Sequence, residues 1–258
     1  MARIIAFAYG LGAYGLFFAA FLYLIGFLAN QVVPKGVDDG VSVSMGFALM
    51  TNFGLIALFG MQHSVMARPR FKRWLTRFVP HSIERSTFVL AASLVLVLLY
   101  WQWRPMPQVV WHVHSVWLST ALWTVFAAGF LLVLLSTFII DHFDLFGLRQ
   151  VYLNLMQRGY THLPFKVTYF YKFVRHPLYL GLLLAFWSTP DMTLGHLVFA
   201  LGMSAYVFIG VRFEERDLET ILGDDYRRYR ERVPMLLPRP DKVHETVTPP
   251  ARAAAGHG

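Results

Sequence analysis

The sequence predicts an all-α membrane protein: a polytopic bundle of about six helices with a C-terminal helical hairpin and a cytoplasmic C-terminal helix. Hydrophobic residues make up 56% of the 258 residues and charged residues only 15%, which is typical of chains that cross a bilayer repeatedly. Several apolar stretches approach the roughly 20 residues needed to cross about 30 Å of hydrocarbon. The chain lacks the strand–helix alternation of a soluble nucleotide-binding domain.

Six apolar segments are long enough to be membrane helices. They span residues 4–29, 43–66, 86–103, 116–140, 170–189 and 192–213. The strictly apolar part of the fifth is short, because it starts only after Pro177, so the last pair is also compatible with a tight hairpin that turns at STPDMT within the bilayer. The mixed-charge stretch RFEERDLETILGDDYRRYRERVP then predicts the cytoplasmic helix, which is broken by the proline-containing PMLLPRP.

Basic residues are concentrated in two of the connections between these segments. Residues 68–85 carry six Lys and Arg and residues 141–176 carry five, whereas the connections near 30–42 and 104–115 carry one each. The positive-inside rule places the two basic connections in the cytoplasm, and six crossings then place both termini there. The net charge of +8 thus reflects topology and contact with membrane lipid, and no nucleic-acid partner is expected.

Ionisable residues near the cytoplasmic ends of the second and fourth segments are functional candidates. The second ends GMQHSVMARP, with His63, and the fourth ends STFIIDHFDLFG, with Asp141, His142 and Asp144. Ionisable groups at membrane depth are costly and usually functional. Capping in water is the alternative, but an acid at a helix C-terminus opposes the macrodipole. We predict catalytic roles for these four residues, with His63 and Asp144 the stronger candidates.

The C-terminal third carries a set of motifs in a fixed order: RHPLYLG, a short apolar hairpin, RFEERDL, and GDDYRRYRERVPMLLP. Together they resemble the isoprenylcysteine carboxyl methyltransferase superfamily of integral membrane methyltransferases. The resemblance implies that these motifs enclose S-adenosylmethionine at the cytoplasmic membrane face. The implied cofactor-binding residues are Arg175, His176, Tyr179, Gly181, Glu214, Glu215, Tyr226, Tyr229, Leu237 and Pro238.

The chemistry of these residue types suits such a cofactor. Arg175 or His176 would pair with the cofactor carboxylate, and Glu214 or Glu215 would accept hydrogen bonds from the ribose hydroxyls. Tyrosines, leucine and proline of the tail would form a slot for adenine, and Gly181 would leave room for the ligand. The chain has no cysteine, so thiolate metal sites are excluded, and no metal is expected.

A longer resemblance, over roughly residues 45–238, is to the methanethiol S-methyltransferase branch of this superfamily, which is related to the NnrU-type proteins. The stretches that carry it include FGLIALFGMQHSVMARPRFK, STFIIDHFDLFGLRQVY and FYKFVRHPLYLG. It implies S-adenosylmethionine-dependent methylation of methanethiol, a small thiol, to dimethyl sulfide. A thiol reacts as its thiolate, so a base such as His63 or Asp144 is expected near the sulfur.

Two other functions remain open. A prenylcysteine or phospholipid substrate would need a wide lateral opening between helices, and a non-enzymatic NnrU-like accessory protein would need no cofactor motif. We expect three regions: membrane helices on the substrate side at 1–140, a cofactor-binding connection, hairpin and tail at 141–238, and a disordered tail at 239–258.

Overall fold

The computed structural model describes residues 1–161 and 167–238. The predicted disordered tail, 239–258, lies outside these residues. Five helices in the described part are long and apolar enough to cross a membrane, and they form a polytopic helical membrane protein as predicted. They are α1 (Ala2–Ala29), α2 (Met45–Ala67), α4 (Glu84–Gln102, preceded by a 3-10 turn at His81–Ile83), α5 (Val116–Ile140) and α9 (Leu194–Leu222).

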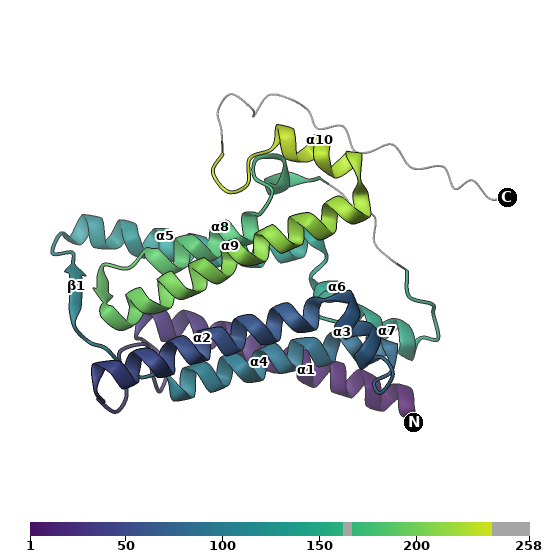
Figure 1. Cartoon of the computed structure of the whole chain (residues 1–258), viewed down its shortest axis with the longest axis horizontal. Coiled ribbons are helices and arrows are strands. Elements are labelled where there is room, and N and C mark those ends of the chain that lie inside the picture. The colour runs from purple at the N-terminus through teal and green to yellow at the C-terminus, as the bar shows by residue number, and fades with distance from the viewer. Residues whose placement is uncertain (162–166, 239–258) are drawn as a thin grey trace.

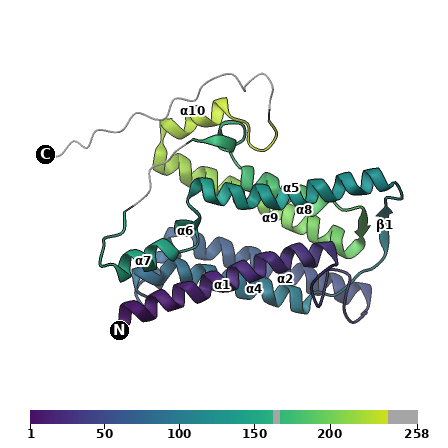
Figure 2. The same ribbon diagram turned by 180° about the vertical axis from the view of Figure 1, so that it is seen from behind.

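The helices form two layers. Figures 1 and 2 show α1, α2 and α4 side by side in one layer, with α5, α9 and the short α8 (Pro177–Trp187) in the other. α2 packs on α9 between the layers, and a core of mainly aromatic and aliphatic side chains fills the interior, with Phe27, Trp103 and Phe199 fully buried. The substrate-side helices of the prediction and the C-terminal hairpin therefore pack directly against each other.

The fifth predicted segment, 170–189, is not one helix. A 3-10 turn occupies Tyr169–Lys172, and α8 begins at Pro177 because proline lacks an N–H and disfavours helical backbone in the residue before it. The 11 residues of α8 rise only about 16 Å, too short to cross the hydrocarbon alone. By contrast, α9 extends nine residues beyond the predicted end at 213, because its charged last turns lie past the membrane core.

Two glycines allow α8 to pack closely against α5. A β-carbon on Gly181 would lie 2.6 Å from the carbonyl oxygen of Gly129, so α8 and α5 touch through their backbones near the middle of α5. α8 runs antiparallel to α5 and begins four residues before Gly181, about 6 Å away. Arg175 and His176 therefore lie beside the second half of α5, within the depth of the bundle.

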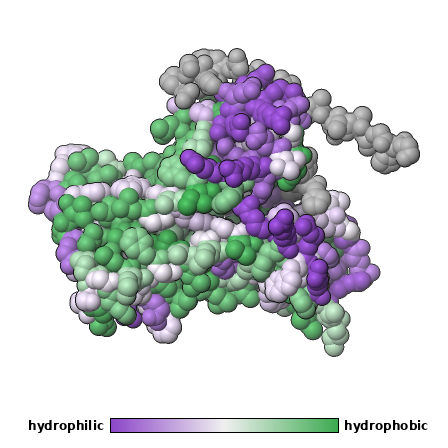
Figure 3. All heavy atoms as spheres, viewed as in Figure 1, coloured by the Kyte–Doolittle hydropathy of each residue, from purple (hydrophilic) through white to green (hydrophobic). Residues whose placement is uncertain are grey.

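The ends of the bundle differ in character. At one end, β1 (Val109–His112) pairs with β2 (Asp191–Thr193) in a small antiparallel sheet that the sequence did not predict. The other end carries the N-terminus and four short helices, and Figure 3 shows its surface to be largely hydrophilic. Those helices are α3 (Pro69–Leu75), α6 (His142–Leu145), α7 (Leu148–Leu155) and α10 (Asp224–Arg232). Both basic connections lie at this polar end.

Candidate functional site

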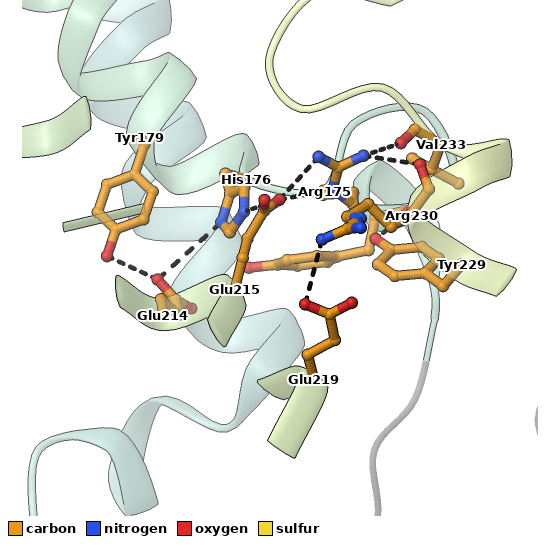
Figure 4. Close-up of polar contacts among 10 residues, drawn as sticks. Arg175, His176, Tyr179, Glu214, Glu215, Glu219, Tyr229, Arg230 and Val233 are labelled. Atoms are coloured by element: carbon orange, nitrogen blue, oxygen red, sulfur yellow. Dashed lines mark hydrogen bonds and ion pairs between the residues drawn. The ribbon is translucent and has the colours of Figure 1, made fainter. Parts of the chain in front are cut away.

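Arg175 joins three parts of the chain through its guanidinium group (Figure 4). Its Nε and Nη2 atoms lie 2.8 and 2.7 Å from Oε1 of Glu215 on α9. Its Nη1 atom donates to the carbonyl oxygens of Arg230 and Val233, at the end of α10. The two charged side chains are only 9% and 15% exposed, so this is a buried ion pair. The guanidinium of Arg175 is thus already engaged, and it holds α8, α9 and the tail together.

The backbone before α8 adds a second link to the tail. The amides of Arg175 and His176 donate to the carbonyl oxygens of Pro234 and Met235 at 2.9 and 3.1 Å. These amides precede the first turn of α8, whose leading N–H groups have no partner inside the helix. The RHP motif and the PMLLP motif are therefore paired along their backbones.

His176, Tyr179 and the two glutamates form the polar centre of the site. The imidazole Nε2 of His176 lies 3.2 Å from Oε1 of Glu215, and its Nδ1 lies 4.0 Å from Oε2 of Glu214. Tyr179, one turn further along α8, donates its hydroxyl to the same Glu214 oxygen at 2.8 Å. The His176 side chain is buried, whereas that of Glu214 is 45% exposed. Glu214 therefore keeps an accessible carboxylate oxygen for a ligand.

Tyr226 and Tyr229 form an aromatic wall on α10. Both are buried and pack with Val167 and Val233, and the Tyr229 hydroxyl donates to the carbonyl of Tyr171 at 2.7 Å. Burial, followed by the charge of Glu215, raises the pKa of Tyr226, and burial also raises that of Tyr229. Both hydroxyls are therefore neutral hydrogen-bond donors at physiological pH.

The remaining predicted cofactor residues have other surroundings. Gly181 faces Gly129 of α5, so its missing side chain serves helix packing. Leu237 is 74% exposed and Pro238 is exposed, while the neighbouring Leu236 is buried. The structure thus brings together seven of the ten predicted residues, namely Arg175, His176, Tyr179, Glu214, Glu215, Tyr226 and Tyr229.

His63 lies in an aromatic enclosure between α2, α4 and α9. The rings of Phe88, Phe59 and Tyr206 have centroids 4.9, 5.5 and 6.0 Å from its own. Its Nδ1 atom is buried and has no hydrogen-bond partner among the described residues. A buried imidazole nitrogen without a hydrogen-bond partner is uncommon, and it distinguishes His63 from the other candidate histidines, His142 and His176.

Tyr206 links this enclosure to the α8–α9 site, and sequence reasoning missed it. Gly60 makes room for its ring on α2, where a β-carbon would lie 3.1 Å from Cδ2 of Tyr206. Its hydroxyl is within electrostatic reach of both Tyr179 and Glu214. The signal was the spacing on α9: Tyr206 precedes Glu214 by eight residues, slightly more than two turns, so the two side chains project on the same side of the helix, roughly 80° apart.

Asp141, His142 and Asp144 have partners within the polar end of the bundle. Asp141 caps α6 by accepting from the Asp144 amide at 3.0 Å, so it caps the N-terminus of the next helix rather than opposing the dipole of α5. Asp144 accepts from Arg149 at 3.2 Å and from Tyr160 at 3.1 Å.

His142 is 3% exposed, and both of its ring nitrogens have partners. Nε2 lies 2.8 Å from the Tyr14 hydroxyl, Nδ1 lies 2.8 Å from Thr137 Oγ1, and the ring stacks on Phe138. Burial lowers the pKa of His142, an effect that the charge of Asp141 opposes. Its satisfied ring fits a structural role at the junction of α1, α5 and α6.

Comparison with known proteins assigns the chain to a family. The family model described as NnrU protein matches residues 53–238, which include every motif of the site. The chain belongs to the NnrU family. No solved structure shows significant similarity to it.

Named relatives of this NnrU-family chain fall into two groups. It is 52% identical to "Methanethiol S-methyltransferase" of Mycobacterium tuberculosis over 94% of this chain and 99% of that protein. It is 54% identical to "Methanethiol S-methyltransferase 1" of Bradyrhizobium diazoefficiens, over 92% of this chain and 83% of that protein. Similarity at 26% identity extends to "Nurim" of Bos taurus, over 86% of this chain and 88% of that protein.

The arrangement defines what the site can do chemically. One half-exposed carboxylate, Glu214, one largely buried carboxylate, Glu215, a buried imidazole and neutral tyrosines suit a cationic ligand that carries hydroxyl groups. Within the described residues, no group of three or more His, Cys, Asp or Glu side chains lies close enough to hold a metal ion.

Proposed function

We propose that this protein is a methanethiol S-methyltransferase that uses S-adenosylmethionine and forms dimethyl sulfide. The protein would lie in a bacterial inner membrane, with the site at the cytoplasmic face and both termini in the cytoplasm. The relatives that share 52% and 54% identity with it carry the methanethiol S-methyltransferase name. The observation that carries the proposal is the buried Arg175–Glu215 pair, which unites the three motifs of the C-terminal third.

The residues of the α8–α9 site fit S-adenosylmethionine. Glu214 has the exposed carboxylate oxygen that ribose hydroxyls or an ammonium group need, and Tyr179 fixes that carboxylate in place. The rings of His176 and Tyr179, 5.5 Å apart, offer π faces to a sulfonium cation. When bound, S-adenosylmethionine supplies a methyl group on a positively charged sulfur, and transfer to a thiol releases one proton.

The geometry changes the expected role of Arg175. Its guanidinium already binds Glu215 and two carbonyl oxygens, so it does not remain for the cofactor carboxylate. We assign it to positioning, since it fixes Glu215 and hence His176. Glu215 likewise accepts from both of these side chains, which leaves Glu214 as the glutamate that contacts the ligand.

The substrate side of the site is assigned to the enclosure around His63. A methanethiol molecule is small enough to lie against Phe88, Phe59 and Tyr206, and the free Nδ1 of His63 would accept the thiol proton. Enclosure by aromatic rings keeps water away from the sulfur and orients it toward α9. Region 1–140 would therefore bind the thiol, and region 141–238 the cofactor.

A binding experiment tests the cofactor half. Titration calorimetry of the detergent-purified protein with S-adenosylmethionine should show weaker binding for Glu214→Ala and Glu215→Ala. Asp225→Ala is the matched control, because this carboxylate lies on the surface of α10 and pairs only with Arg228 among the described residues. Unchanged affinity in both glutamate variants would remove them from the site.

A further inference from the structure

Arg85 is a partly buried cation at the start of α4 that has no counter-ion in the described residues. Its Nε atom is shielded from solvent and has no hydrogen-bond partner there, and no carboxylate of the described chain forms an ion pair with it. The backbone at Arg85 is fixed, because Gly147 packs against it: a β-carbon on Gly147 would lie 3.2 Å from the Arg85 carbonyl carbon. A guanidinium nitrogen that is shielded from water and has no hydrogen-bond partner is unfavourable, and a bound anion would supply that partner.

The helix geometry directs Arg85 toward His63. Phe88 follows Arg85 by three residues and so shares its face of α4, and Phe88 contacts the His63 ring edge-on at 4.9 Å. Arg85 is itself within electrostatic reach of His63. Arg85 and His63 therefore lie near each other, and each has a shielded nitrogen without a hydrogen-bond partner among the described residues.

Further charged and titratable groups surround this pair. Burial, followed by the charge of Arg85, lowers the pKa of Lys72 on α3, so a second amine adjoins the guanidinium. The groups that face Arg85 and His63 from the packed elements are Lys72 of α3, Glu84 of α4, Tyr160 after α7 and Tyr206 of α9. Glu84 acts electrostatically on Lys72 and keeps a buried Oε1 atom without a hydrogen-bond partner among the described residues, whereas Asp144 accepts from Tyr160 and pairs with Arg149.

The proposed reaction requires an anionic substrate, the thiolate. A thiol is a poor nucleophile, and only its thiolate attacks the methyl carbon. Ionisation breaks the S–H bond, leaves the electron pair on sulfur and delivers the proton to a base. An imidazole can take the proton, but a fixed positive charge beside the sulfur is what lowers the thiol pKa.

We propose that Arg85 is a catalytic residue that binds the methanethiolate sulfur and stabilises its negative charge while His63 accepts the proton. This inference rests on the proposed methyl transfer to a small thiol. The sulfur would then form its bond to the methyl carbon while the bond from that carbon to the donor's sulfonium sulfur breaks, with the electron pair left on the donor as a neutral thioether. The proton on His63 is released to water at the polar end of the bundle. Arg85 thus supplies the positive charge beside the substrate sulfur.

The test uses two substrates that differ in acidity and hardly in size. Methanethiol is mostly protonated at neutral pH, whereas methaneselenol is mostly ionised. An opposite charge within about 4–6 Å shifts a pKa by roughly 1–3 units, so Arg85→Gln should lower kcat/KM for methanethiol about 10–1,000-fold near pH 7. Its rate should recover as the pH rises, and its rate with methaneselenol should stay near that of the unchanged protein.

Two control variants separate charge from structure. Arg85→Lys keeps the charge and should restore much of the methanethiol activity. Arg77→Gln removes one positive charge from the exposed surface of the same basic connection and should change neither rate nor pH profile. Arg85→Gln should also melt close to the unchanged protein, because no described hydrogen bond is lost with it.

Two results would overturn the proposal. An equal loss for both substrates, with an unshifted pH profile, would mean that Arg85 has a structural role. A weaker affinity for S-adenosylmethionine, with the thiol dependence unchanged, would instead assign Arg85 to the cofactor carboxylate. If the unchanged protein methylates neither substrate, the proposed function fails first, which is a different and separable outcome.

Discussion

Replacement of Arg175 by alanine should release the tail from α8. The substitution removes both contacts to Glu215 and the two bonds to the carbonyl oxygens of Arg230 and Val233. Both charged side chains are at most 15% exposed, and loss of one partner of a buried ion pair costs about 3–5 kcal/mol. The lost contacts join the segment before α8 to α9 on one side and to the end of α10 on the other, so the cost should appear as local opening rather than as unfolding of the bundle.

Hydrogen–deuterium exchange measures this opening directly. In the unchanged protein the amides of Arg175 and His176 are bonded to Pro234 and Met235, and these bonds do not involve the Arg175 side chain. A peptide that covers 173–180 should therefore exchange faster in Arg175→Ala only if the tail has detached. Arg228→Ala is the control, because its pair with Asp225 is exposed and contributes at most about 1 kcal/mol. Equal protection in the two variants would refute the assignment of Arg175 as the link.

Three further substitutions have defined outcomes. Gly181→Ala should destabilise the protein by about 1–3 kcal/mol in thermal unfolding, because the new methyl meets α5 backbone, whereas Gly12→Ala, with no atom within 4 Å, should not destabilise it. Tyr179→Phe should weaken S-adenosylmethionine binding by roughly 1 kcal/mol, about fivefold by calorimetry, because the Glu214 carboxylate loses the hydrogen bond that holds it in place. Unchanged affinity would mean that the ligand binds elsewhere. Gly223→Ala should increase proteolytic cleavage between α9 and α10, because the backbone of Gly223, with φ of 57° and ψ of −129°, suits only glycine. Resistance to proteolysis equal to that of the unchanged protein would contradict this prediction.

The sequence predicted the bundle well because long apolar helices leave a strong and simple signal. Four predicted segments correspond closely to α1, α2, α4 and α5. The fifth was wrong as a continuous helix, since apolar composition alone does not show that Pro177 fixes its start and leaves a helix too short to span. The small sheet was not predicted, because each strand has only three or four residues and gains stability only from the other.

The candidate site was predicted in part. The order of the motifs predicted Arg175, His176 and the two glutamates as site residues, and the structure places these four side chains together. The sequence could not show that Arg175 already forms an ion pair with Glu215. Polarity at helix ends selected His63 along with His142, and only the packing separates them: one has an unsatisfied nitrogen, and the other has partners for both. Tyr206 and Arg85 were missed as site residues because neither belongs to a motif.

We propose above that this NnrU-family protein methylates methanethiol with a cofactor bound at the site on α8 and α9. The most direct measurement is headspace gas chromatography of dimethyl sulfide, produced by purified protein in detergent with S-adenosylmethionine and methanethiol. We predict product well above a no-enzyme control, and its loss in Glu214→Ala but not in Asp225→Ala. No product from protein that binds S-adenosylmethionine would contradict the thiol substrate, and no binding at all would contradict the enzyme.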